Sequence, residues 1–253
     1  MKLIDSHAHI DGREYDADRR QVLQRARASG VVAIINIGAD LASSRRSVAL
    51  AQAHPEVYAT VGVHPHSASR LTDETISQLK TLAQSPKVVA IGEIGLDFYR
   101  NLSPQADQWR AFQAQLDLAG ELGLPVVVHD RDAHEEILEM LKEHPRLRVL
   151  MHCFSGDLNL ARRSLDLGHY LALGGPVTFD NGHRAQEVAR WVPLDRLLLE
   201  TDSPYLTPHP HRGRRNEPAY TALVNQKIAE LRKRSPEEVA RQTTENCRRF
   251  FGI

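Results

Sequence analysis

Few cysteines and no long apolar run limit the classes of protein to which this sequence can belong. It has two cysteines, Cys153 and Cys247, too few for a disulfide framework and typical of a reducing compartment. No apolar segment approaches the roughly 20 residues that a membrane-spanning helix needs. The N-terminus lacks a basic segment followed by an apolar stretch, so we expect no signal peptide. These absences predict a cytoplasmic protein with no membrane anchor and no obligate protein partner.

The sequence also lacks an excess of charge of either sign. Its 32 Lys and Arg residues balance 32 Asp and Glu residues, whereas a protein that coats duplex nucleic acid nonspecifically carries a basic excess. An enzyme that holds a phosphodiester through metal ions is compatible with this balance, because bound cations can be the largest charges in a site.

Eight apolar, β-branched segments alternate with helical patterns along the chain. Continuous apolar segments indicate parallel strands that are covered on both faces. Their order predicts an α/β fold, a (β/α)₈ TIM barrel formed by one domain over residues 1–253. The alternative, a doubly wound open sheet, favours a Gly-rich loop after the first strand, where this chain has His7-Ala8-His9. The predicted strands are Lys2–Ser6, Val31–Ile37, Val57–Val63, Val88–Ile94, Pro125–Val128, Val149–Met151, Tyr170–Leu173 and Leu197–Glu200.

Two Ser-Pro pairs predict where helices begin. Ser103-Pro104 supplies an N-cap and a first-turn proline to a helix with an apolar face. Ser235-Pro236 does the same near the C-terminus, and Glu238 completes a Ser-x-x-Glu capping box.

Histidines and carboxylates stand where most of the predicted strands end. His7 and His9 are two residues apart, so in an extended chain both point to one face and can bind one metal ion. The active site of a TIM barrel forms at the carboxyl ends of its strands, and closure brings those ends together. The candidate residues are His7, His9, His64, Glu93, His129, His152 and Asp202.

The ligand types favour a metal-assisted hydrolase. Imidazole and carboxylate groups suit Zn²⁺, Mn²⁺, Ni²⁺ or Fe, while carboxylates and water suit Mg²⁺. Four neutral histidines with Glu93 and Asp202 would leave two divalent cations with a net charge of about +2. Such an excess suits a substrate whose negative charge increases in the transition state.

Six motifs together resemble the TatD-type deoxyribonucleases, which belong to the barrel-fold metal-dependent hydrolases. The resemblance runs from residue 3 to about residue 250, with the motifs in the family's order. The motifs are Asp5-Ser6-His7-Ala8-His9, Gly62-Val63-His64-Pro65-His66, Gly92-Glu93-Ile94-Gly95-Leu96-Asp97, His152-Cys153-Phe154-Ser155-Gly156, Glu200-Thr201-Asp202-Ser203-Pro204-Tyr205-Leu206 and Arg215-Asn216-Glu217-Pro218.

The resemblance implies a centre with two divalent ions, Mg²⁺, Mn²⁺ or Zn²⁺. Related barrel hydrolases bridge their metals with a carboxylated lysine at the end of strand four, where this chain has Glu93. The implied ligands are His7, His9 and Asp202 for the first ion, His129 and His152 for the second, and Glu93 for both.

Three of the candidate residues are expected to be catalytic. Glu93 would hold both ions around a shared water, and Asp202 would accept the proton of that water. His64 would lie near the scissile phosphate as a hydrogen-bond donor or proton relay. Alternatively, His64 is a turn residue before Pro65.

The family's activity is metal-dependent hydrolysis of DNA, with 3′→5′ exonuclease action on single strands. The resemblance therefore implies single-stranded 3′ ends of DNA as the substrate. Aromatic side chains on the expected upper loops would stack on bases, and arginines would pair with phosphates. The alternative for each of these residues is an exposed loop position with no ligand. With His64, the candidate substrate contacts are Arg131, Phe154, Tyr205, Arg215 and Asn216.

Two other functions stay open from the residues alone. A barrel hydrolase could act on a small amide, lactone or phosphoester, because a fold and a metal pair do not determine the substrate. A non-catalytic scaffold is the third possibility, and it would show no dependence on metal.

Overall fold

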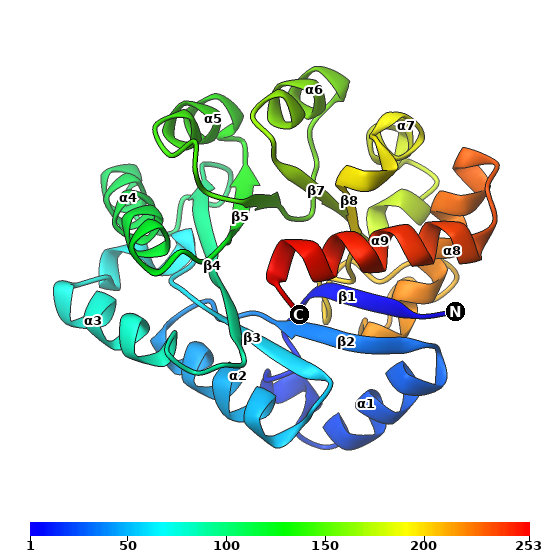
Figure 1. The fold of residues 1–253 in the computed structure, drawn as a ribbon, viewed down its shortest axis with the longest axis horizontal. Helices are drawn as coiled ribbons and strands as arrows, with labels where there is room; N and C mark the ends of the chain where they lie inside the picture. The colour runs from blue at the N-terminus through cyan, green and yellow to red at the C-terminus, as the bar shows by residue number, and fades with distance from the viewer.

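The computed structural model describes residues 1–253 and forms a ring of eight parallel strands with helices outside it (Figure 1). The strands follow one another around the ring in chain order, which confirms the predicted (β/α)₈ barrel. The doubly wound alternative is wrong, because such a sheet reverses its strand order at a switch point. The strands are β1 (Leu3–Ala8), β2 (Val31–Asn36), β3 (Val57–Val61), β4 (Val88–Asp97), β5 (Val126–Arg131), β6 (Val149–Met151), β7 (Tyr170–Leu173) and β8 (Leu197–Leu199).

The ring closes between β1 and the segment that follows β8. The backbone N–H of Asp202 donates to the carbonyl of His7 at 2.9 Å, and that of His9 donates to the carbonyl of Ser203 at 2.8 Å. Ala8 and Ser203 form a parallel bridge between these two bonds. Closure therefore occurs at the carboxyl ends of the strands and brings Asp202 beside His7 of β1 and His9, which directly follows it.

Three strands run further than their apolar segments predict. β1, β4 and β5 continue through polar residues to Ala8, Asp97 and Arg131. The pairing of β4 with β5 continues through Gly95 and His129. A Cβ atom on Gly95, whose φ is 143°, would lie 2.0 Å from the carbonyl oxygen of His129, so only glycine allows this approach. Ladder hydrogen bonds thus hold the polar strand ends in a fixed geometry.

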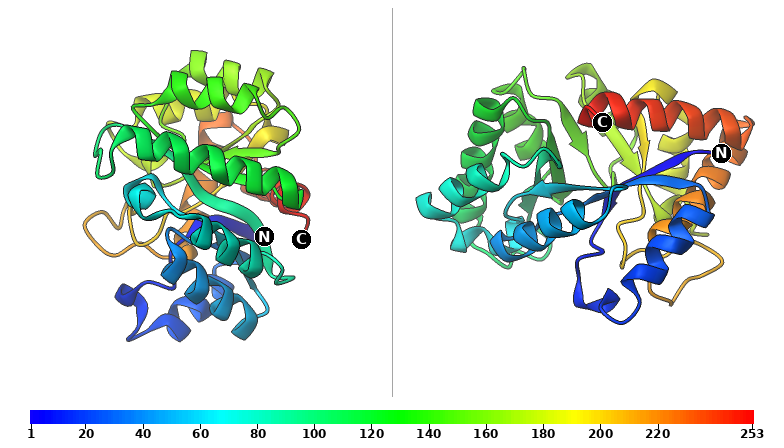
Figure 2. Two further views of the ribbon diagram at one scale, coloured as in Figure 1. Left: turned by 90° about the vertical axis from the view of Figure 1, so that its left-hand side faces the viewer. Right: turned by 60° about the horizontal axis from the view of Figure 1, so that its bottom comes forward.

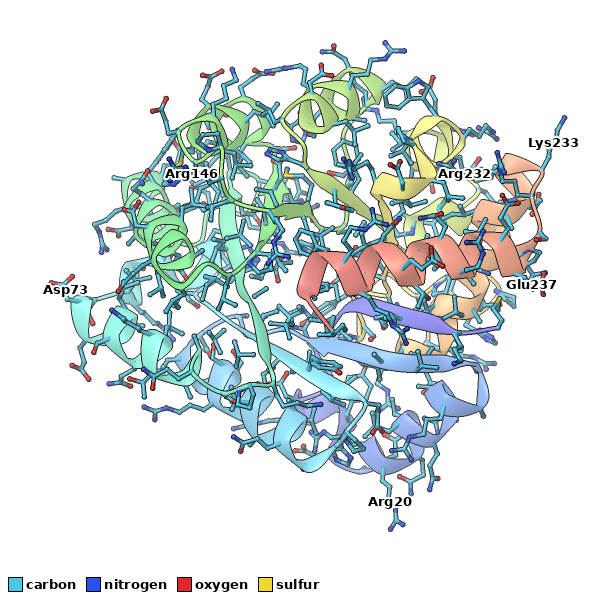
Figure 3. All side chains as sticks on the ribbon, in the orientation of Figure 1. Arg20, Asp73, Arg146, Arg232, Lys233 and Glu237 are labelled. Atoms are coloured by element: carbon cyan, nitrogen blue, oxygen red, sulfur yellow. The ribbon has the colours of Figure 1, made fainter.

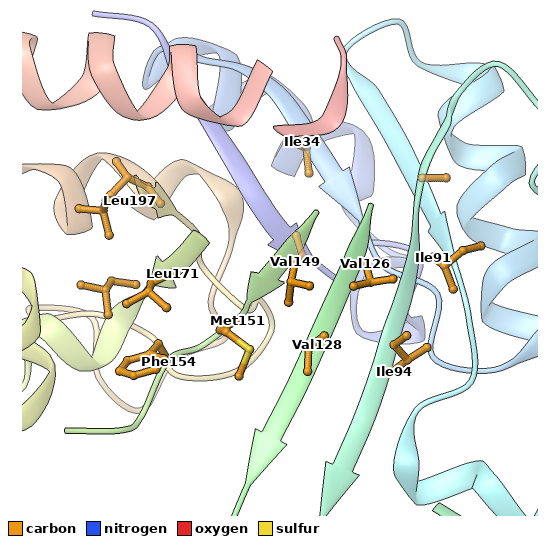
Figure 4. Close-up of a cluster of buried hydrophobic side chains, with 14 of the residues drawn as sticks. Ile34, Ile91, Ile94, Val126, Val128, Val149, Met151, Phe154, Leu171 and Leu197 are labelled. Atoms are coloured by element: carbon orange, nitrogen blue, oxygen red, sulfur yellow. The ribbon is translucent and has the colours of Figure 1, made fainter. Parts of the chain in front are cut away.

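Helices cover the outside of the barrel, and one of them closes its lower end. Outward-facing strand residues such as Val128, Met151 and Leu171 pack in a large apolar cluster, part of which is shown in Figure 4. Inward-facing residues form a second cluster with Phe250 and Phe251. The eight-residue-or-longer helices are α1 (Arg19–Ala28), α2 (Leu41–Ala53), α3 (Asp73–Leu82), α4 (Gln105–Leu122), α5 (His134–Lys142), α6 (Leu158–Asp166), α7 (His183–Trp191), α8 (Thr221–Arg232) and α9 (Pro236–Phe251).

The last helix, α9, crosses the amino-terminal end of the barrel (Figures 1 and 2). The hydroxyl of Thr244 donates to the carbonyl of Lys2 at 3.0 Å. The side-chain amide of Asn246 donates to the carbonyl of Leu197 at 2.8 Å. Both acceptors lie at the starts of strands. The lower end is therefore filled by apolar packing, and the upper end holds the polar side chains.

Only one of the two predicted serine caps is present. The hydroxyl of Ser235 accepts the backbone N–H of Glu238 at 3.2 Å, although the Glu238 carboxylate pairs with Arg234 and does not complete the capping box. The prediction that Ser103 caps α4 is wrong. Its buried hydroxyl instead donates to the carbonyl of His66 at 3.0 Å, which ties the loop before α4 to the segment after β3.

Charged side chains lie mainly at the periphery. Arg20, Asp73, Lys233 and Glu237 are exposed and project from the outer helices and turns in Figure 3. None of the helices is both long and apolar enough to cross a membrane.

Candidate metal centre

Glu93 lies at the middle of the predicted ligands. Its side chain projects from β4 and is almost fully buried, with 4% of the residue exposed. One carboxylate oxygen, Oε1, lies 2.8 Å from His129 Nδ1 and 2.8 Å from His152 Nε2. The other, Oε2, lies 3.5 Å from His7 Nε2 and 3.8 Å from His9 Nε2. The two oxygens therefore face different sets of histidines.

The first ligand group consists of His7, His9 and Asp202. The two imidazole Nε2 atoms are 3.2 Å apart, as the alternation of side chains along β1 requires. Asp202 Oδ1 lies 3.7 Å from each of them. The hydrogen bonds that close the barrel hold this carboxylate in place.

The second ligand group consists of His129 and His152, and a carboxylate lies behind each imidazole. Asp97 Oδ2 is 3.2 Å from His129 Nε2, and Glu200 Oε1 is 3.8 Å from His152 Nδ1. The same Glu200 oxygen accepts the backbone N–H of Cys153 at 2.6 Å. Such outer carboxylates orient imidazole ligands and increase their basicity.

The two groups are in direct contact. The imidazole rings of His7 and His152 stack with centroids 3.8 Å apart and planes 11° from parallel. Their pKa values move in opposite directions. Burial lowers the pKa of His7, and the neighbouring His152 lowers it further. Burial alone would also lower the pKa of His152, but Glu93 and Glu200 raise it well above the ordinary value.

Both carboxylates in the centre are held in the ionised form. Burial alone would raise the pKa of Glu93, but His152, His64 and the hydrogen bond from His129 hold it well below the ordinary value. The same opposition applies to Asp202, where burial would raise the pKa but His9, His7 and His152 together lower it. Both groups can therefore act as anionic ligands near neutral pH.

Asp5 supports the first ligand group from below. Its buried carboxylate accepts the hydroxyl of Thr201 at 2.6 Å and the backbone N–H of Thr201 at 2.9 Å. A longer bond of 3.3 Å comes from the backbone N–H of His7. Burial raises the pKa of Asp5 to about 8 despite these bonds. Asp5 thus connects the residues next to His7 and Asp202 on opposite sides of the barrel closure.

The hydrogen bonds of His64 indicate its tautomer. Its Nδ1 accepts the backbone N–H of His66 at 3.0 Å, so a neutral ring carries its proton on Nε2. Burial lowers the pKa of His64 to about 4, which favours that neutral ring. The Nε2 atom lies 3.4 Å from Glu93 Oε1. His64 therefore presents a hydrogen-bond donor to the centre. It also occupies the turn before Pro65, as the alternative interpretation of the sequence predicts.

The donor atoms fit divalent cations. Three sets, each with ligand atoms within 4.8 Å of one another, are present: His7, Glu93 and His152; His7, His9 and Asp202; and His64, Glu93 and His129. Imidazole nitrogens with paired carboxylate oxygens are the donor set of Zn²⁺ and Mn²⁺ sites, and the carboxylates also suit Mg²⁺. The buried Nδ1 atoms of His7 and His152 have no hydrogen-bond partner within 3.5 Å, so no competing bond holds these rings in another orientation.

A cavity of about 1400 Å³ opens above these residues. Its walls include the metal-ligand candidates other than His7, together with the exposed side chains of Arg131 and Tyr205. The ring of Tyr205 lies 6.2 Å from that of His9, centroid to centroid. Two of the expected substrate contacts therefore border the centre.

The side chains of the other three expected substrate contacts are buried or already paired. Asn216 is fully buried, and its amide donates to the carbonyls of Thr201 and Tyr205. Arg215 lies outside the cavity and pairs with Asp18 at 2.7 Å. Phe154 borders the cavity but is 6% exposed and packs in the apolar cluster of Figure 4. We correct the assignments of Asn216 and Arg215, since each of these side chains supports a loop, while the assignment of Phe154 stays a prediction.

Comparison with known proteins agrees with this geometry. A family model described as TatD related DNase matches residues 4–252. The chain belongs to the TatD family. An uncharacterized metal-dependent hydrolase of Bacillus subtilis, YabD, is 44% identical over 99% of this chain and 99% of its own. A protein of Erwinia tasmaniensis named 3′-5′ ssDNA/RNA exonuclease TatD is 40% identical over 99% of this chain and 100% of its own.

A solved structure gives the same family. The TatD homolog YJJV of Escherichia coli K12 superposes with a TM-score of 0.93 at 34% identity, covering 99% of this chain and 98% of the other. The protein is thus a TatD-family metal-dependent hydrolase that acts on ester bonds. The family resemblance and the enzyme class expected from the sequence are confirmed.

Two carboxylates lie behind imidazoles of this TatD-family site. Asp97, at the end of the motif of residues 92–97, contacts both His129 and His66, the latter at 2.7 Å. Glu200 was seen only as part of a motif, although it lies behind His152. Its position directly after an apolar strand, two residues before Asp202, is the one signal in the sequence that marks it.

Proposed function

We propose that this TatD-family hydrolase is a 3′-5′ exonuclease that removes nucleotides from single-stranded DNA with the help of two divalent ions. The observation that carries the proposal is the position of Glu93, whose two oxygens face the two ligand groups separately. A carboxylate in that position suits a pair of cations, each with its own imidazoles. Mg²⁺, Mn²⁺ and Zn²⁺ are all compatible with this mixture of ligands.

Each residue has a distinct role in the proposed reaction. When bound, the cations lower the pKa of water and supply positive charge at the phosphate. His7, His9 and Asp202 would hold one ion, His129 and His152 the other, and Glu93 both. Asp202 is ionised at neutral pH and lies at the cavity wall, so it accepts the proton of the attacking water. His64 donates a hydrogen bond from Nε2 to a phosphate oxygen.

The cavity supports a polymeric substrate. At about 1400 Å³ it exceeds the roughly 300–1,000 Å³ of sites for single small ligands. Arg131 and Tyr205 offer the two contacts that a single strand needs, a cation for phosphate and an aromatic face for a base. The relatives named 3′-5′ ssDNA/RNA exonuclease, about 40% identical over the whole chain, point to the same substrate class.

The test uses one single-stranded oligonucleotide labelled at either end, incubated with the purified protein and Mg²⁺ or Mn²⁺. A 3′-to-5′ exonuclease releases a labelled mononucleotide at once from the 3′-labelled strand. It converts the 5′-labelled strand into a descending ladder. Asp202→Asn serves as the control for a contaminating nuclease, because it removes the proton acceptor from a site at the cavity wall.

Three outcomes would contradict this proposal. Turnover of a small lactone, amide or phosphoester, with both labelled strands intact, would favour the small-substrate hydrolase. No turnover with any divalent ion, together with a melting temperature indifferent to those ions, would favour a scaffold. A ladder from the 3′-labelled strand would reverse the proposed polarity.

We also propose that the protein works in the cytoplasm. Both cysteines are free, and Cys247 is buried, as is usual in a reducing compartment. Fluorescence of a tagged chain outside the cytoplasm of its own host would contradict this.

A further inference from the structure

Two large apolar side chains project into solvent beside the metal centre. Tyr99 is 61% exposed and Leu102 is 65% exposed, whereas most large apolar residues of the chain are buried. Both lie on the short loop between β4 and α4, the loop that follows directly from Asp97. Leu102 borders the cavity. Exposure of this kind beside a cavity is typical of a binding surface.

The loop is held in this conformation by buried polar groups. Asp97 Oδ1 accepts the backbone N–H of Arg100 at 2.7 Å. The fully buried side chain of Gln108 accepts the backbone N–H of Asp97 at 2.8 Å and donates to the carbonyl of Ser103 at 2.9 Å. The exposed side chains therefore stand on a preorganised loop, which lowers the entropic cost of binding.

One arginine lies against the ring of Tyr99, and a second borders the cavity nearby. The guanidinium carbon of Arg131 lies 4.3 Å from the ring centroid and so covers one face of the ring. Arg100 and Arg131 are both exposed and border the cavity. Asp97, at the base of the loop, also contacts His129 of the second ligand group. An aromatic surface with two arginines thus lies on that side of the centre.

An exposed aromatic that borders the cavity itself, Tyr205, has the opposite electrostatic setting. Tyr205 lies on the side of the first ligand group, near His9. An acidic residue, Glu14, also borders the cavity, and its charge acts on the Tyr205 hydroxyl. Phosphate groups are therefore favoured near Arg100 and Arg131 rather than near Tyr205 and Glu14. When a nucleotide is removed from the end of a strand, the remaining strand and its backbone phosphates extend to one side of the cleavage point only.

We propose that Tyr99, Leu102, Arg100 and Arg131 form a binding site for a nucleotide of the strand that remains after cleavage. A base stacks against Tyr99 and Leu102, and the two arginines pair with the backbone phosphates. The nucleotide to be released lies on the Tyr205 side. The inference rests on the proposed nuclease function and adds a direction in which the strand leaves the centre.

Binding of matched oligonucleotides tests this site. One probe is oligothymidylate of about 12 nucleotides, within the range bound by single-strand sites. The other has the same length and phosphates but abasic residues in place of bases. Fluorescence anisotropy with Mg²⁺ in an Asp202→Asn background gives Kd for each probe without cleavage. The variants are Tyr99→Ala, Tyr99→Phe, Arg100→Gln and, as a control, Trp191→Ala.

Trp191 is a matched control because it repeats the chemistry elsewhere. It is 38% exposed, with the guanidinium carbon of Arg162 at 5.1 Å from its ring. It ends α7, directly before the start of β8, so it lies at the opposite end of the barrel. An aromatic ring with an arginine is present in both places, but only the arginine at Tyr99, Arg131, borders the cavity.

We expect Tyr99→Ala to raise Kd for oligothymidylate by about 10-fold or more, with a change below about twofold for the abasic probe. Tyr99→Phe should retain affinity, Arg100→Gln should weaken both probes, and Trp191→Ala should weaken neither. Equal losses for the two probes with Tyr99→Ala, or no loss with either, would overturn the proposal, as would absence of oligonucleotide binding altogether. If the expected pattern appears but the unmodified chain cuts no strand, the binding site stands and the nuclease proposal fails.

Discussion

The two ligand groups of the metal centre differ in what lies behind their imidazoles. In the second group, His129 is backed by Asp97 and His152 by Glu200. In the first group, the carboxylates of Glu93 and Asp202 both lie on the Nε2 side of His7, and none lies behind its buried Nδ1. The anion of the first group is Asp202 itself, which faces the cavity. The contrast indicates a division of labour, with one half built to hold its ion firmly and the other to carry out proton transfer.

The largest effect should follow a change at the residue that both halves share. Glu93→Gln removes a buried charge that faces all four histidines of the two groups. We expect hydrolysis of the diester to fall by about 10³-fold or more, since both cations lose a common ligand. Elemental analysis should show fewer bound ions per chain. Full activity with two bound ions would show that Glu93 does not connect the halves.

Asp202→Asn should separate chemistry from the second ligand group. Without its proton acceptor, the protein should lose about 10²- to 10⁴-fold in kcat. Binding of one ion at His129 and His152 should persist, because neither residue contacts Asp202 in the ligand sets. Calorimetric titration with Mn²⁺ measures the remaining stoichiometry, and circular dichroism checks the fold. A variant with near-normal kcat would mean that another group accepts the proton.

Asp97→Asn should weaken the second group alone. Removal of the carboxylate behind a ligand imidazole typically lowers metal affinity about 10- to 100-fold. Asp130→Asn is the matched control, because Asp130 also borders the cavity and pairs with a histidine, His134, at 2.7 Å. His134 belongs to none of the ligand sets. Equal losses of Mn²⁺ affinity in the two variants would show that Asp97 acts only through its negative charge near the cavity and not through its contact with His129.

The pH dependence of metal binding should also differ between the halves. Burial opposes charge on His129, but Asp97 and Glu93 raise its pKa, and the pKa of His152 is raised as well. A cation must displace the protons that such imidazoles hold, so affinity of the second group falls as pH falls. In the first group, His7 has a lowered pKa and releases no proton near neutrality, whereas burial alone would lower the pKa of His9 but Asp202 and Glu93 raise it. We expect about one more proton released per ion at the second group, measured by calorimetry in buffers of different ionisation enthalpy.

The strands and most ligands follow from the sequence because both depend on local pattern. The apolar segments that predict β6 and β7 match the observed strands residue for residue. β4 and β5 exceed their apolar segments because Gly95 permits close pairing beyond Ile94 and Val128. Ladder pairing between strands is not visible in the pattern of either one.

The sequence predicts a site residue only where the residue type and its place at a strand end together indicate its location in the fold. Ligand histidines at strand ends are evident once the barrel is assumed, and Tyr205 borders the cavity as expected. Asn216 and Arg215 lie in a motif of the same apparent specificity, yet they bind backbone carbonyls and Asp18. The exposed Tyr99 belongs to no motif and depends on the buried Gln108, eleven residues from Asp97. Tertiary contacts separate these cases.

A crystal soaked in Mn²⁺ and measured for anomalous scattering tests the central claim most directly. The claim is that Glu93 joins two cation sites with unlike surroundings. We predict two peaks about 3.5–4 Å apart, one on each side of the Glu93 carboxylate, with the peak at His129 and His152 the first to fill as Mn²⁺ is increased. A single peak, or two peaks of which neither contacts Glu93, would contradict the account.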